Sequence, residues 1–353
     1  MSELHKFVFE GLPVRGALVR LTDAWTEILA RRQANSATGA WPPPVAELLG
    51  EMAAAGVLMQ SNIKFNGALI LQVFGDGPVK VAVAEVQHDL ALRVTAKVVG
   101  DVSVGDRLSQ LVNVHNKGRC AITLDPRDRF PGQQPYQGVV PLHGDHREKL
   151  DKLSDVLQHY MLQSEQLDTT LVLAADAKVA AGLLIQRLPI EGEGNLAGSR
   201  AARPPEGADA PSGGSGSRAG LERGGARFLS RANEDAIGTQ EDYNRIATLA
   251  ASLKRDELLE LDVDTVLRRL FWQEKLLRFP PETPRFACTC SRERVANMIR
   301  GLGQAEADDI LAEQGRIEVG CDFCGQQYRF DAVDTAQLFT SPGDQPPVTS
   351  AMQ

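Results

Sequence analysis

Four of the five cysteines in this 353-residue chain lie in two tight pairs near the C-terminus. The first pair is Cys288-Thr289-Cys290 and the second is Cys321-Asp322-Phe323-Cys324. A CxxC turn is a usual half-site for a tetrahedral zinc ion, and a CxC pair places two thiols close enough to share a metal or to oxidise to each other. No histidine follows His159. A metal bound here would therefore be held by four thiolates, a soft donor set that points to Zn²⁺.

Paired cysteines also occur as structural disulfides, in iron–sulfur clusters, at catalytic zinc sites and in purely structural zinc knuckles. We find no apolar N-terminal stretch long enough for a signal peptide and expect a reducing compartment, where stable disulfides are rare. Iron–sulfur clusters use different cysteine spacings. A catalytic zinc needs an open coordination position, which four protein sulfurs do not leave. The structural knuckle remains open as the main alternative.

Composition and charge exclude several classes of protein. The hydrophobic fraction of 43% is ordinary for a globular chain, and the absence of a run of about 18 apolar residues excludes a transmembrane helix. The net charge of −8 argues against a general nucleic-acid binder. Residues 281–340 hold six arginines, no lysine and ten acidic residues. We therefore expect a cytoplasmic protein with neither nucleic-acid nor membrane partners.

Residues 1–190 predict an α+β domain with a largely antiparallel sheet and helices. The turn Gly75-Asp76-Gly77-Pro78 separates two runs with the alternating pattern of a hairpin. An apolar face over Asp145–Gln163 predicts a helix, with Asp145 as its N-cap. Further helices are expected after a cap at Thr22 or Asp23 and over Val45–Met59. Further strands are expected over Phe7–Phe9, Gly16–Leu21, Leu92–Val98, Ala121–Leu124 and Thr169–Ala175, and Ala180–Leu188 is one more apolar segment that closes the domain.

The rest of the chain divides into four segments. Ten of the forty residues in 191–230 are glycine, which predicts a flexible or disordered insert. Residues 231–280 predict a helical linker, whose helices we expect to have no large core of their own. Residues 281–340 predict a small zinc-binding domain that is marginal without its metal. Helices are expected over Ser291–Arg300 and Ala305–Gln314, and strands over Arg316–Gly320 and Gln326–Phe330. Residues 341–353 predict a disordered tail.

Several short motifs of this sequence occur, in the same order, in one protein family. They are Val14-Arg15-Gly16 with Thr22-Asp23-Ala24-Trp25, Phe65-Asn66-Gly67 through Gly75-Asp76-Gly77-Pro78, Tyr160 through Gln163-Ser164-Glu165-Gln166, Gly182 through Gln186-Arg187-Leu188-Pro189, and Val319-Gly320-Cys321-Asp322-Phe323-Cys324. The CxC pair, a 30-residue spacer and the CxxC pair complete the pattern. Together they resemble the redox-regulated heat-shock chaperone family known as the 33-kilodalton chaperonin.

The resemblance implies a holdase that binds unfolding proteins under oxidative and heat stress and is not an enzyme. It implies that Cys288, Cys290, Cys321 and Cys324 hold Zn²⁺ when reduced. Oxidation would then form the disulfides Cys288–Cys290 and Cys321–Cys324, release the zinc and unfold the linker, and the active form would be a homodimer. Physical chemistry agrees, because loss of a structural zinc should unfold so small a domain. The helices at 242–272 would then lose their docking partner and expose apolar surface to clients.

Three arginines near the CxC pair either offset the negative charge of the metal site or are solvated on a helix face. They are Arg285, Arg292 and Arg294. Cys120, the fifth cysteine, is expected to be a small buried hydrophobe rather than a reactive thiol.

Two competing functions belong to different classes of protein. One is a constitutive zinc-ribbon interaction module, and the second is an N-terminal enzyme such as a hydrolase. No nucleophile–base motif such as G-x-S-x-G supports the enzyme. His143 and His146 have the His-x-x-His spacing but no identifiable third ligand, so we predict no metal site there.

Overall fold

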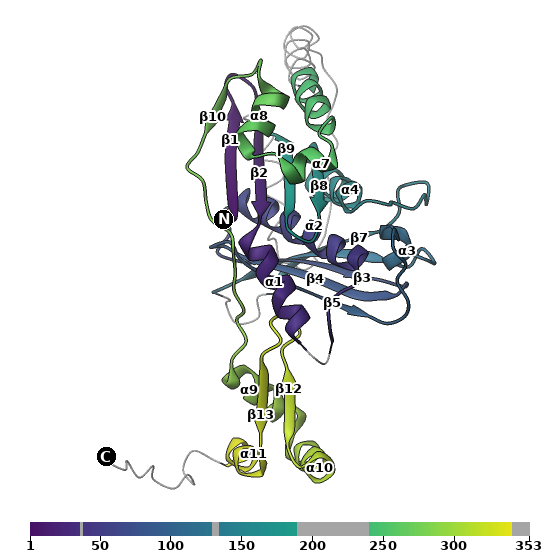
Figure 1. Ribbon diagram of the computed structural model, residues 1–353, viewed down its shortest axis with the longest axis vertical. Coiled ribbons are helices and arrows are strands. Elements are labelled where there is room, and N and C mark those ends of the chain that lie inside the picture. The colour runs from purple at the N-terminus through teal and green to yellow at the C-terminus, as the bar shows by residue number, and fades with distance from the viewer. Residues whose placement is uncertain (36–37, 129–133, 189–239, 341–353) are drawn as a thin grey trace, which may run out of the picture.

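The computed structural model describes residues 1–35, 38–128, 134–188 and 240–340. The chain forms an elongated molecule with a large N-terminal body and a small C-terminal lobe below it (Figure 1). The body contains two sheets of five and six strands, and the lobe contains a two-stranded sheet. The predicted α+β class with largely antiparallel strands is confirmed. The predicted insert and tail lie outside the described residues.

The first sheet combines the first two strands of the chain with strands that lie more than 140 residues later. Its strands run in the order β10-β1-β2-β9-β8, and all neighbours are antiparallel. The predicted strand over 169–175 is confirmed at both ends. The strands are β1 Glu3–Phe9, β2 Val14–Leu21, β8 Thr169–Ala175, β9 Ala180–Arg187 and β10 Leu276–Arg278.

The second sheet runs in the order β11-β5-β4-β3-β6-β7. The predicted hairpin is confirmed as β3 and β4, and β11 joins the edge by pairing in parallel with β5. The sequence predicted the sheet character but not its division into two sheets. The strands are β3 Gly67–Phe74, β4 Val79–Gln87, β5 Ala91–Val98, β6 Arg119–Pro126, β7 Tyr136–Pro141 and β11 Arg285–Phe286.

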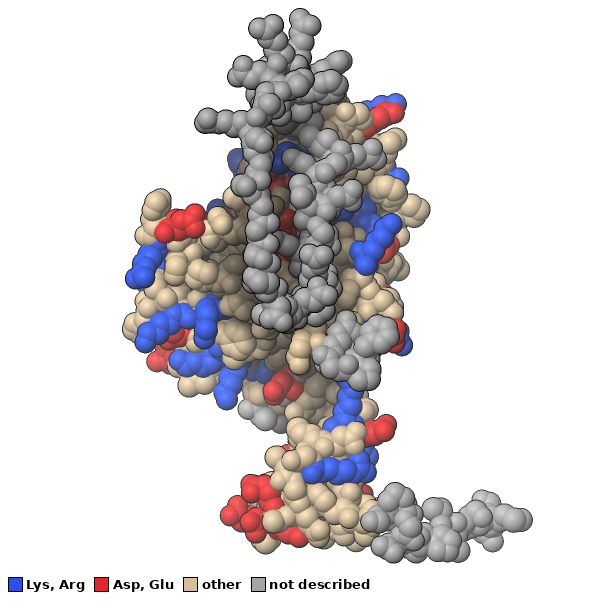
Figure 2. Space-filling model, turned by 180° about the vertical axis from the view of Figure 1, so that it is seen from behind, with Lys and Arg blue, Asp and Glu red and all other residues tan. Residues whose placement is uncertain are grey.

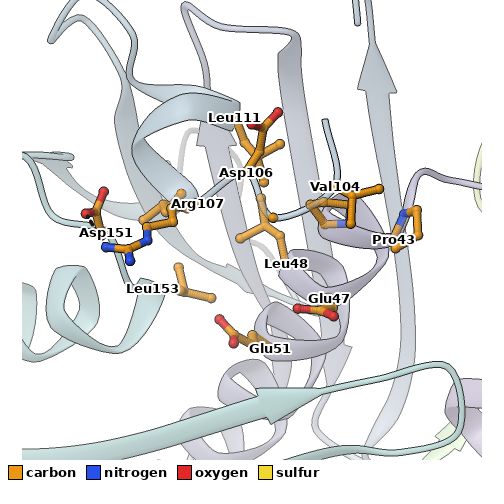
Figure 3. A pocket seen from close by; sticks show the side chains of 13 residues that line it. Pro43, Glu47, Leu48, Glu51, Val104, Asp106, Arg107, Leu111, Asp151 and Leu153 are labelled. Carbon is orange, nitrogen blue, oxygen red and sulfur yellow. Dashed lines mark hydrogen bonds and ion pairs between the residues drawn. The ribbon is translucent and has the colours of Figure 1, made fainter. Parts of the chain in front are cut away.

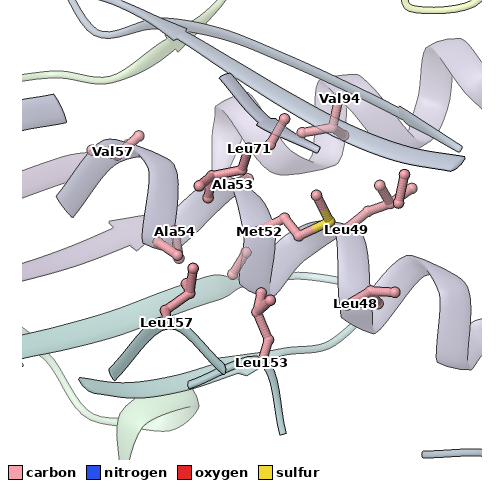
Figure 4. Close-up of a cluster of buried hydrophobic side chains, with 14 of the residues drawn as sticks. Leu48, Leu49, Met52, Ala53, Ala54, Val57, Leu71, Val94, Leu153 and Leu157 are labelled. Carbon is pink, nitrogen blue, oxygen red and sulfur yellow. The ribbon is translucent and has the colours of Figure 1, made fainter. Parts of the chain in front are cut away.

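Helix α2, Pro43–Ser61, lies between the two sheets and forms the centre of the core. Prolines in its first turn favour helix initiation, because their missing N–H groups would lack intrahelical partners there. Every residue over Met52–Gln60 is buried and nearly all are apolar, as expected of a helix segment enclosed on all sides. A Cβ on Gly50 would lie 2.4 Å from the Ala175 Cβ atom, so only glycine allows this approach to β8. Figure 4 shows Met52 and Leu49 of α2 near Leu71 and Val94 of the second sheet, with Leu153 and Leu157 on another side.

Glu51 of α2 lies at the edge of this core, beside a cavity of about 420 Å³. Figure 3 shows Glu47 and Glu51 on the helix, facing the loop that carries Asp106 and Arg107. Burial raises the pKa of the Glu51 carboxyl from 4.5 to about 8; Arg255 opposes the shift and the Glu47 charge adds to it. Glu51 is therefore protonated in the folded protein at neutral pH.

Replacing Glu51 with glutamine is expected to remove a pH-dependent loss of stability. The unfolded chain releases this proton near pH 4.5, whereas the folded protein keeps it until about pH 8. The free energy of unfolding therefore falls as the pH rises through this window. Relative to Glu51→Gln, the wild-type protein should lose about 2–4 kcal/mol over the window. Thermal unfolding of both proteins at its two ends measures the difference, and a gap that is independent of pH would contradict the assigned pKa.

Further helices cover the domain, and one of them begins later than predicted. Helix α4 spans Leu153–Glu165 with Lys152 as its N-cap, so the predicted start and cap at Asp145 are wrong. Residues before it form a loop in which Gly144 N donates to the Glu148 carbonyl at 2.9 Å. Arg147 in this loop has a positive φ of 62°, which a helix does not allow. The remaining helices of the domain are α1 Asp23–Ala34 and α3 Leu108–Val112.

The linker helices dock on the outer face of the first sheet (Figure 1). They comprise residues 240–251, α7 Arg255–Glu260 and α8 Val263–Phe271. Their buried side chains share one apolar cluster with Phe7 and Phe9 of β1. Among the described residues this cluster has no member from 281–340. The expectation that these helices lack a large core and dock on the zinc domain is therefore wrong, because β1, β2, β8 and β9 supply the core on which they dock.

A polar anchor holds these helices to the same sheet. Arg20 of β2 donates from Nη1 to the carbonyls of Leu258 and Leu261 at 2.8 and 2.6 Å, and from Nη2 to that of Leu259 at 3.0 Å. A cation at a helix C-terminus satisfies carbonyls that lack intrahelical partners and complements the helix dipole.

The C-terminal lobe packs three helices around a hairpin. Its hydrophobic core is small, with Ile299, Ile317 and Phe330 among its buried side chains. Figure 2 shows acidic side chains gathered at the end of the lobe, where α10 carries four carboxylates. The sequence predicted each element except α11. The elements are α9 Arg292–Leu302, α10 Gln304–Gln314, β12 Ile317–Gly320, β13 Gln327–Phe330 and α11 Ala332–Phe339.

Candidate metal centre

The four C-terminal cysteines meet where the lobe joins the N-terminal body. Cys288 and Cys290 follow β11 and precede α9, whereas Cys321 and Cys324 lie in the turn between β12 and β13. The Sγ atoms of Cys288 and Cys321 are 3.6 Å apart, and those of Cys290 and Cys324 are 3.4 Å apart. All four sulfurs lie within 4.8 Å of one another. The structure thus brings together the four residues singled out in the sequence.

The cluster fits a tetrahedral metal with four sulfur ligands. A Zn–S bond of about 2.3 Å places two ligating sulfurs about 3.8 Å apart, close to the spacings seen here. The CxxC turn is closed by backbone hydrogen bonds from Cys321 N to the Gln326 carbonyl and from Gly325 N to the Cys321 carbonyl, at 2.9 and 2.8 Å. Gly325 has a φ of 72°, in the left-handed region that favours glycine. The hairpin therefore presents two sulfurs in a fixed direction.

The thiols of the cluster differ in acidity. Burial raises the pKa of Cys288, but hydrogen bonds from the Cys290 backbone and side chain and from Arg93 outweigh it and lower the pKa to about 7. Burial raises the pKa of Cys321 and of Cys324 above the ordinary value. Cys288 is therefore the most acidic of these three thiols, and a thiolate is the species that binds metals and reacts with oxidants.

The three arginines beside the CxC pair point elsewhere. The Arg285 guanidinium pairs with the Asp89 carboxylate at 2.6 Å, and that of Arg294 donates to the Thr289 hydroxyl at 2.7 Å. Arg292 pairs with Asp334 at 2.8 Å and lies over the Phe330 ring. All three side chains are exposed and contact no cysteine sulfur in the described part of the chain, which favours the second alternative, arginines solvated at the surface. Only Arg292 and Arg294 lie on a helix, since Arg285 belongs to β11.

Sequence reasoning missed two contacts to the cysteines. Arg93 Nη1 lies 3.8 Å from the Cys288 Sγ atom, and the Tyr328 hydroxyl donates to the Cys290 Sγ atom at 3.1 Å. Tyr328 stands on the predicted strand next to the CxxC turn, so its proximity could have been inferred. Arg93 lies 195 residues before Cys288, and no local pattern connects the two.

Cys120 is separate from the cluster. It is fully buried on β6, and this burial raises its thiol pKa to about 12. The prediction of a small buried hydrophobe is confirmed. His143 and His146 lie in the loop before α4, and the metal-ligand cluster found among the described residues contains neither.

A larger cavity of about 860 Å³ lies between the second sheet and the chain segment that enters the cluster. Its lining mixes acidic and basic side chains, including Glu85, Arg93 and Arg127. None of the helices in the described part of the chain has the length and apolar character needed to cross a bilayer.

Comparison with known proteins extends the resemblance over nearly the whole chain. The family model described as Hsp33 protein matches residues 2–331. The 33 kDa chaperonin of Chromobacterium violaceum is 41% identical, covering 96% of this chain and 94% of that protein. That of Methylobacillus flagellatus is 38% identical, covering 96% and 95%.

A solved structure shares the fold. The crystal structure of the 33 kDa chaperonin (heat shock protein 33 homolog) from Thermotoga maritima aligns with a TM-score of 0.66 at 17% identity. The alignment covers 95% of this chain and 97% of that one. The family model, the sequence relatives and the cysteine cluster agree, and this chain belongs to the Hsp33 family of chaperones.

Proposed function

We propose that this protein is a holdase whose four C-terminal cysteines form a redox switch. The observation that carries the proposal is the gathering of four thiols within 4.8 Å in a chain of a chaperone family. Every ligand at this site is oxidisable, and each has a second cysteine within three residues of it. We propose an N-terminal domain over 1–190, an insert over 191–230, a linker over 231–280, a switch domain over 281–340 and a tail over 341–353.

In the reduced protein Cys288, Cys290, Cys321 and Cys324 hold one Zn²⁺ ion. The bound ion keeps the sulfurs deprotonated and contributes on the order of 10–16 kcal/mol of apparent binding free energy, which is also folding free energy for the site. The β12–β13 hairpin would orient Cys321 and Cys324, and the segment between β11 and α9 would supply Cys288 and Cys290. The Tyr328 hydroxyl hydrogen-bonds the Cys290 sulfur and fixes its direction.

Oxidation removes the metal ligands. A peroxide accepts two electrons from each pair of thiolates, so that one S–S bond forms, the O–O bond breaks and two protons complete two water molecules. We propose the pairs Cys288–Cys290 and Cys321–Cys324, with release of the metal as the aquated ion. The closest sulfurs belong to opposite turns, at 3.6 and 3.4 Å. Pairing within each turn is favoured once the lobe loosens, because only those sulfurs stay together in an unfolding chain.

The switch reaches the linker through two short strands. Cys288 directly follows the segment that contains β10 and β11, which pair with β1 and β5 at the edges of the two sheets. Backbone hydrogen bonds between Leu4 and Glu282, at 2.8 and 2.9 Å, hold the segment between them. We propose that loss of the metal frees this segment from Cys288 backwards and then detaches α8 and α7. The sheet face around Phe7 and Phe9 would be exposed and bind clients.

We propose that the active form is a homodimer and works in the cytoplasm during oxidative and heat stress. Its partners are unfolded or partly folded proteins, and no nucleic acid or membrane is involved. The protein acts by binding and not as an enzyme.

The test follows the switch and the activity together. Reduced, zinc-loaded protein is treated with hydrogen peroxide under mild heating, while zinc release, loss of thiols and aggregation of a heat-denatured client are measured. We expect zinc and thiols to be lost together and client aggregation to be suppressed only afterwards. Retention of zinc and thiols, or unchanged client aggregation, would contradict the proposal.

A constitutive zinc-binding module is the second candidate. The small core around the β12–β13 hairpin favours it, because such a core needs a metal for its own stability. Under this alternative, loss of a ligand destabilises the lobe, but oxidant has no effect on client binding.

A further inference from the structure

Arg93 connects the N-terminal body to both halves of the cysteine cluster. Its Nη1 atom lies 3.8 Å from the Cys288 Sγ atom in the CxC segment. Its guanidinium also lies over the Phe323 ring, 4.2 Å from the ring centroid. Phe323 is one of the two residues between Cys321 and Cys324. One side chain of β5 therefore contacts two loops that lie more than 30 residues apart in the sequence.

Glu85 holds Arg93 in this position. It faces Arg93 directly across the β4–β5 pair. Its Oε2 atom accepts from Arg93 Nε and Nη2 at 3.1 and 2.6 Å. The two side chains are only 16% and 12% exposed, so water screens their attraction weakly. A guanidinium already fixed by a forked contact loses little freedom when it also contacts a sulfur and a ring.

Neighbouring residues of β5 hold the same two loops. Thr95 follows Arg93 by two residues on β5, and its hydroxyl donates to the Asp322 carbonyl at 2.9 Å. The parallel pairing of Phe286 with Leu92 brings the chain to Cys288 alongside the same strand. The cysteine cluster is therefore built against the edge of the N-terminal sheet and is not confined to the lobe.

We propose that Arg93 is a positioning residue for the cysteine cluster and couples its redox state to the N-terminal domain. This proposal rests on the proposed function and adds the side chain through which the N-terminal domain responds to oxidation of the cysteines. Four thiolates around one divalent ion carry a net negative charge, and Arg93 places a positive charge against one of them. In a disulfide the Cys288 sulfur is neutral, so the charge-assisted contact is lost. Arg93 thus stabilises only the reduced arrangement of the cysteines. Its replacement should weaken the packing of both cysteine-bearing loops against β5.

The test compares two replacements of Arg93 with a control that removes a positive charge elsewhere on the same strand. Arg93→Met combined with Glu85→Gln deletes the guanidinium without leaving Glu85 as an unpaired carboxylate. Arg93→Lys keeps the charge but lacks the fork and the planar stacking surface. Lys97→Met removes a positive charge from an exposed position of the same strand and serves as the control. Zinc affinity by chelator competition, the rate of peroxide-driven zinc release and hydrogen exchange over 317–330 are measured on the full chain.

We expect the double variant to bind zinc about tenfold more weakly and to release it about tenfold faster, as is typical for groups that orient metal ligands. Arg93→Lys should lie between it and the wild-type protein, and Lys97→Met should match the wild type. Wild-type zinc affinity and release rate in both Arg93 variants would overturn the role of Arg93 while leaving the switch intact. If wild-type protein itself keeps its zinc in peroxide, the proposed function fails instead. If the far-UV circular dichroism spectrum shows that the double variant is unfolded, Arg93→Lys alone tests the proposal. Wild-type zinc affinity and release rate in Arg93→Lys would then overturn it.

Discussion

Replacing Cys321 with serine is expected to unfold the C-terminal lobe while the N-terminal domain stays folded. Serine is a poor ligand for a soft metal site, so zinc affinity should fall by more than the roughly 10–100-fold seen when a ligand-orienting group is lost. The lobe then depends on a core of five buried side chains, which are Ala296, Ile299, Ala307, Ile317 and Phe330. A core this small does not offset the conformational entropy of some 50 residues.

Zinc content and hydrogen exchange measure this effect. Exchange over 292–339 should approach that of an unfolded chain, and protection should also fall in β10, β11, α7 and α8, which the metal is proposed to hold in place. Exchange in α2 should be unchanged. Cys120→Ala is the matched control, because it removes a buried thiol outside the cluster and should leave zinc binding intact. A Cys321→Ser protein that binds zinc normally and keeps a protected lobe would exclude Cys321 as a ligand.

Replacing Phe271 with aspartate is expected to activate client binding without any oxidant. Phe271 is 2% exposed and packs edge-on against Phe9, with ring centroids 5.0 Å apart. Removing the ring costs about 3–5 kcal/mol, and burying a carboxylate in its place costs more. Helix α8 should therefore detach and expose the sheet face around Phe9, while the cysteine cluster remains reduced and bound to zinc.

The adjacent Trp272 supplies the control for this variant. Trp272 is 72% exposed, so Trp272→Asp introduces the same charge one residue away without disturbing the docked face. Client aggregation, zinc content and exchange over 255–271 are measured for both proteins under reducing conditions. Loss of protection in α8 without suppression of aggregation would show that this face is not the client-binding surface.

Local patterns predicted much of the fold and the clustering of the four cysteines. The Gly75–Pro78 turn between alternating runs predicted a hairpin because the turn type and the strand period are both short-range properties. The cysteine spacing likewise predicted the cluster, since each half-site is formed within one turn. Helix α11 was not predicted, although it too has a local signal, because Asp331 caps it by accepting from Asp334 N at 2.8 Å.

Long-range pairing explains what the sequence did not predict. The linker helices are amphipathic, but their periodicity does not identify the partner of their apolar face. That partner is β1, more than 230 residues earlier in the chain. Arg93 is hidden for the same reason, because only the pairing of β11 with β5 brings it to Cys288. The predicted start of α4 was wrong because an apolar helical period does not exclude a preceding loop.

We propose that zinc bound by the four cysteines keeps the linker helices docked on the N-terminal sheet. Hydrogen exchange over 240–340, measured in zinc-loaded reduced protein and again after peroxide, tests it most directly. We expect protection of α7, α8 and the lobe in the reduced state and its loss from all three after oxidation, with α2 protected throughout. Equal protection of the linker helices in both states would contradict it.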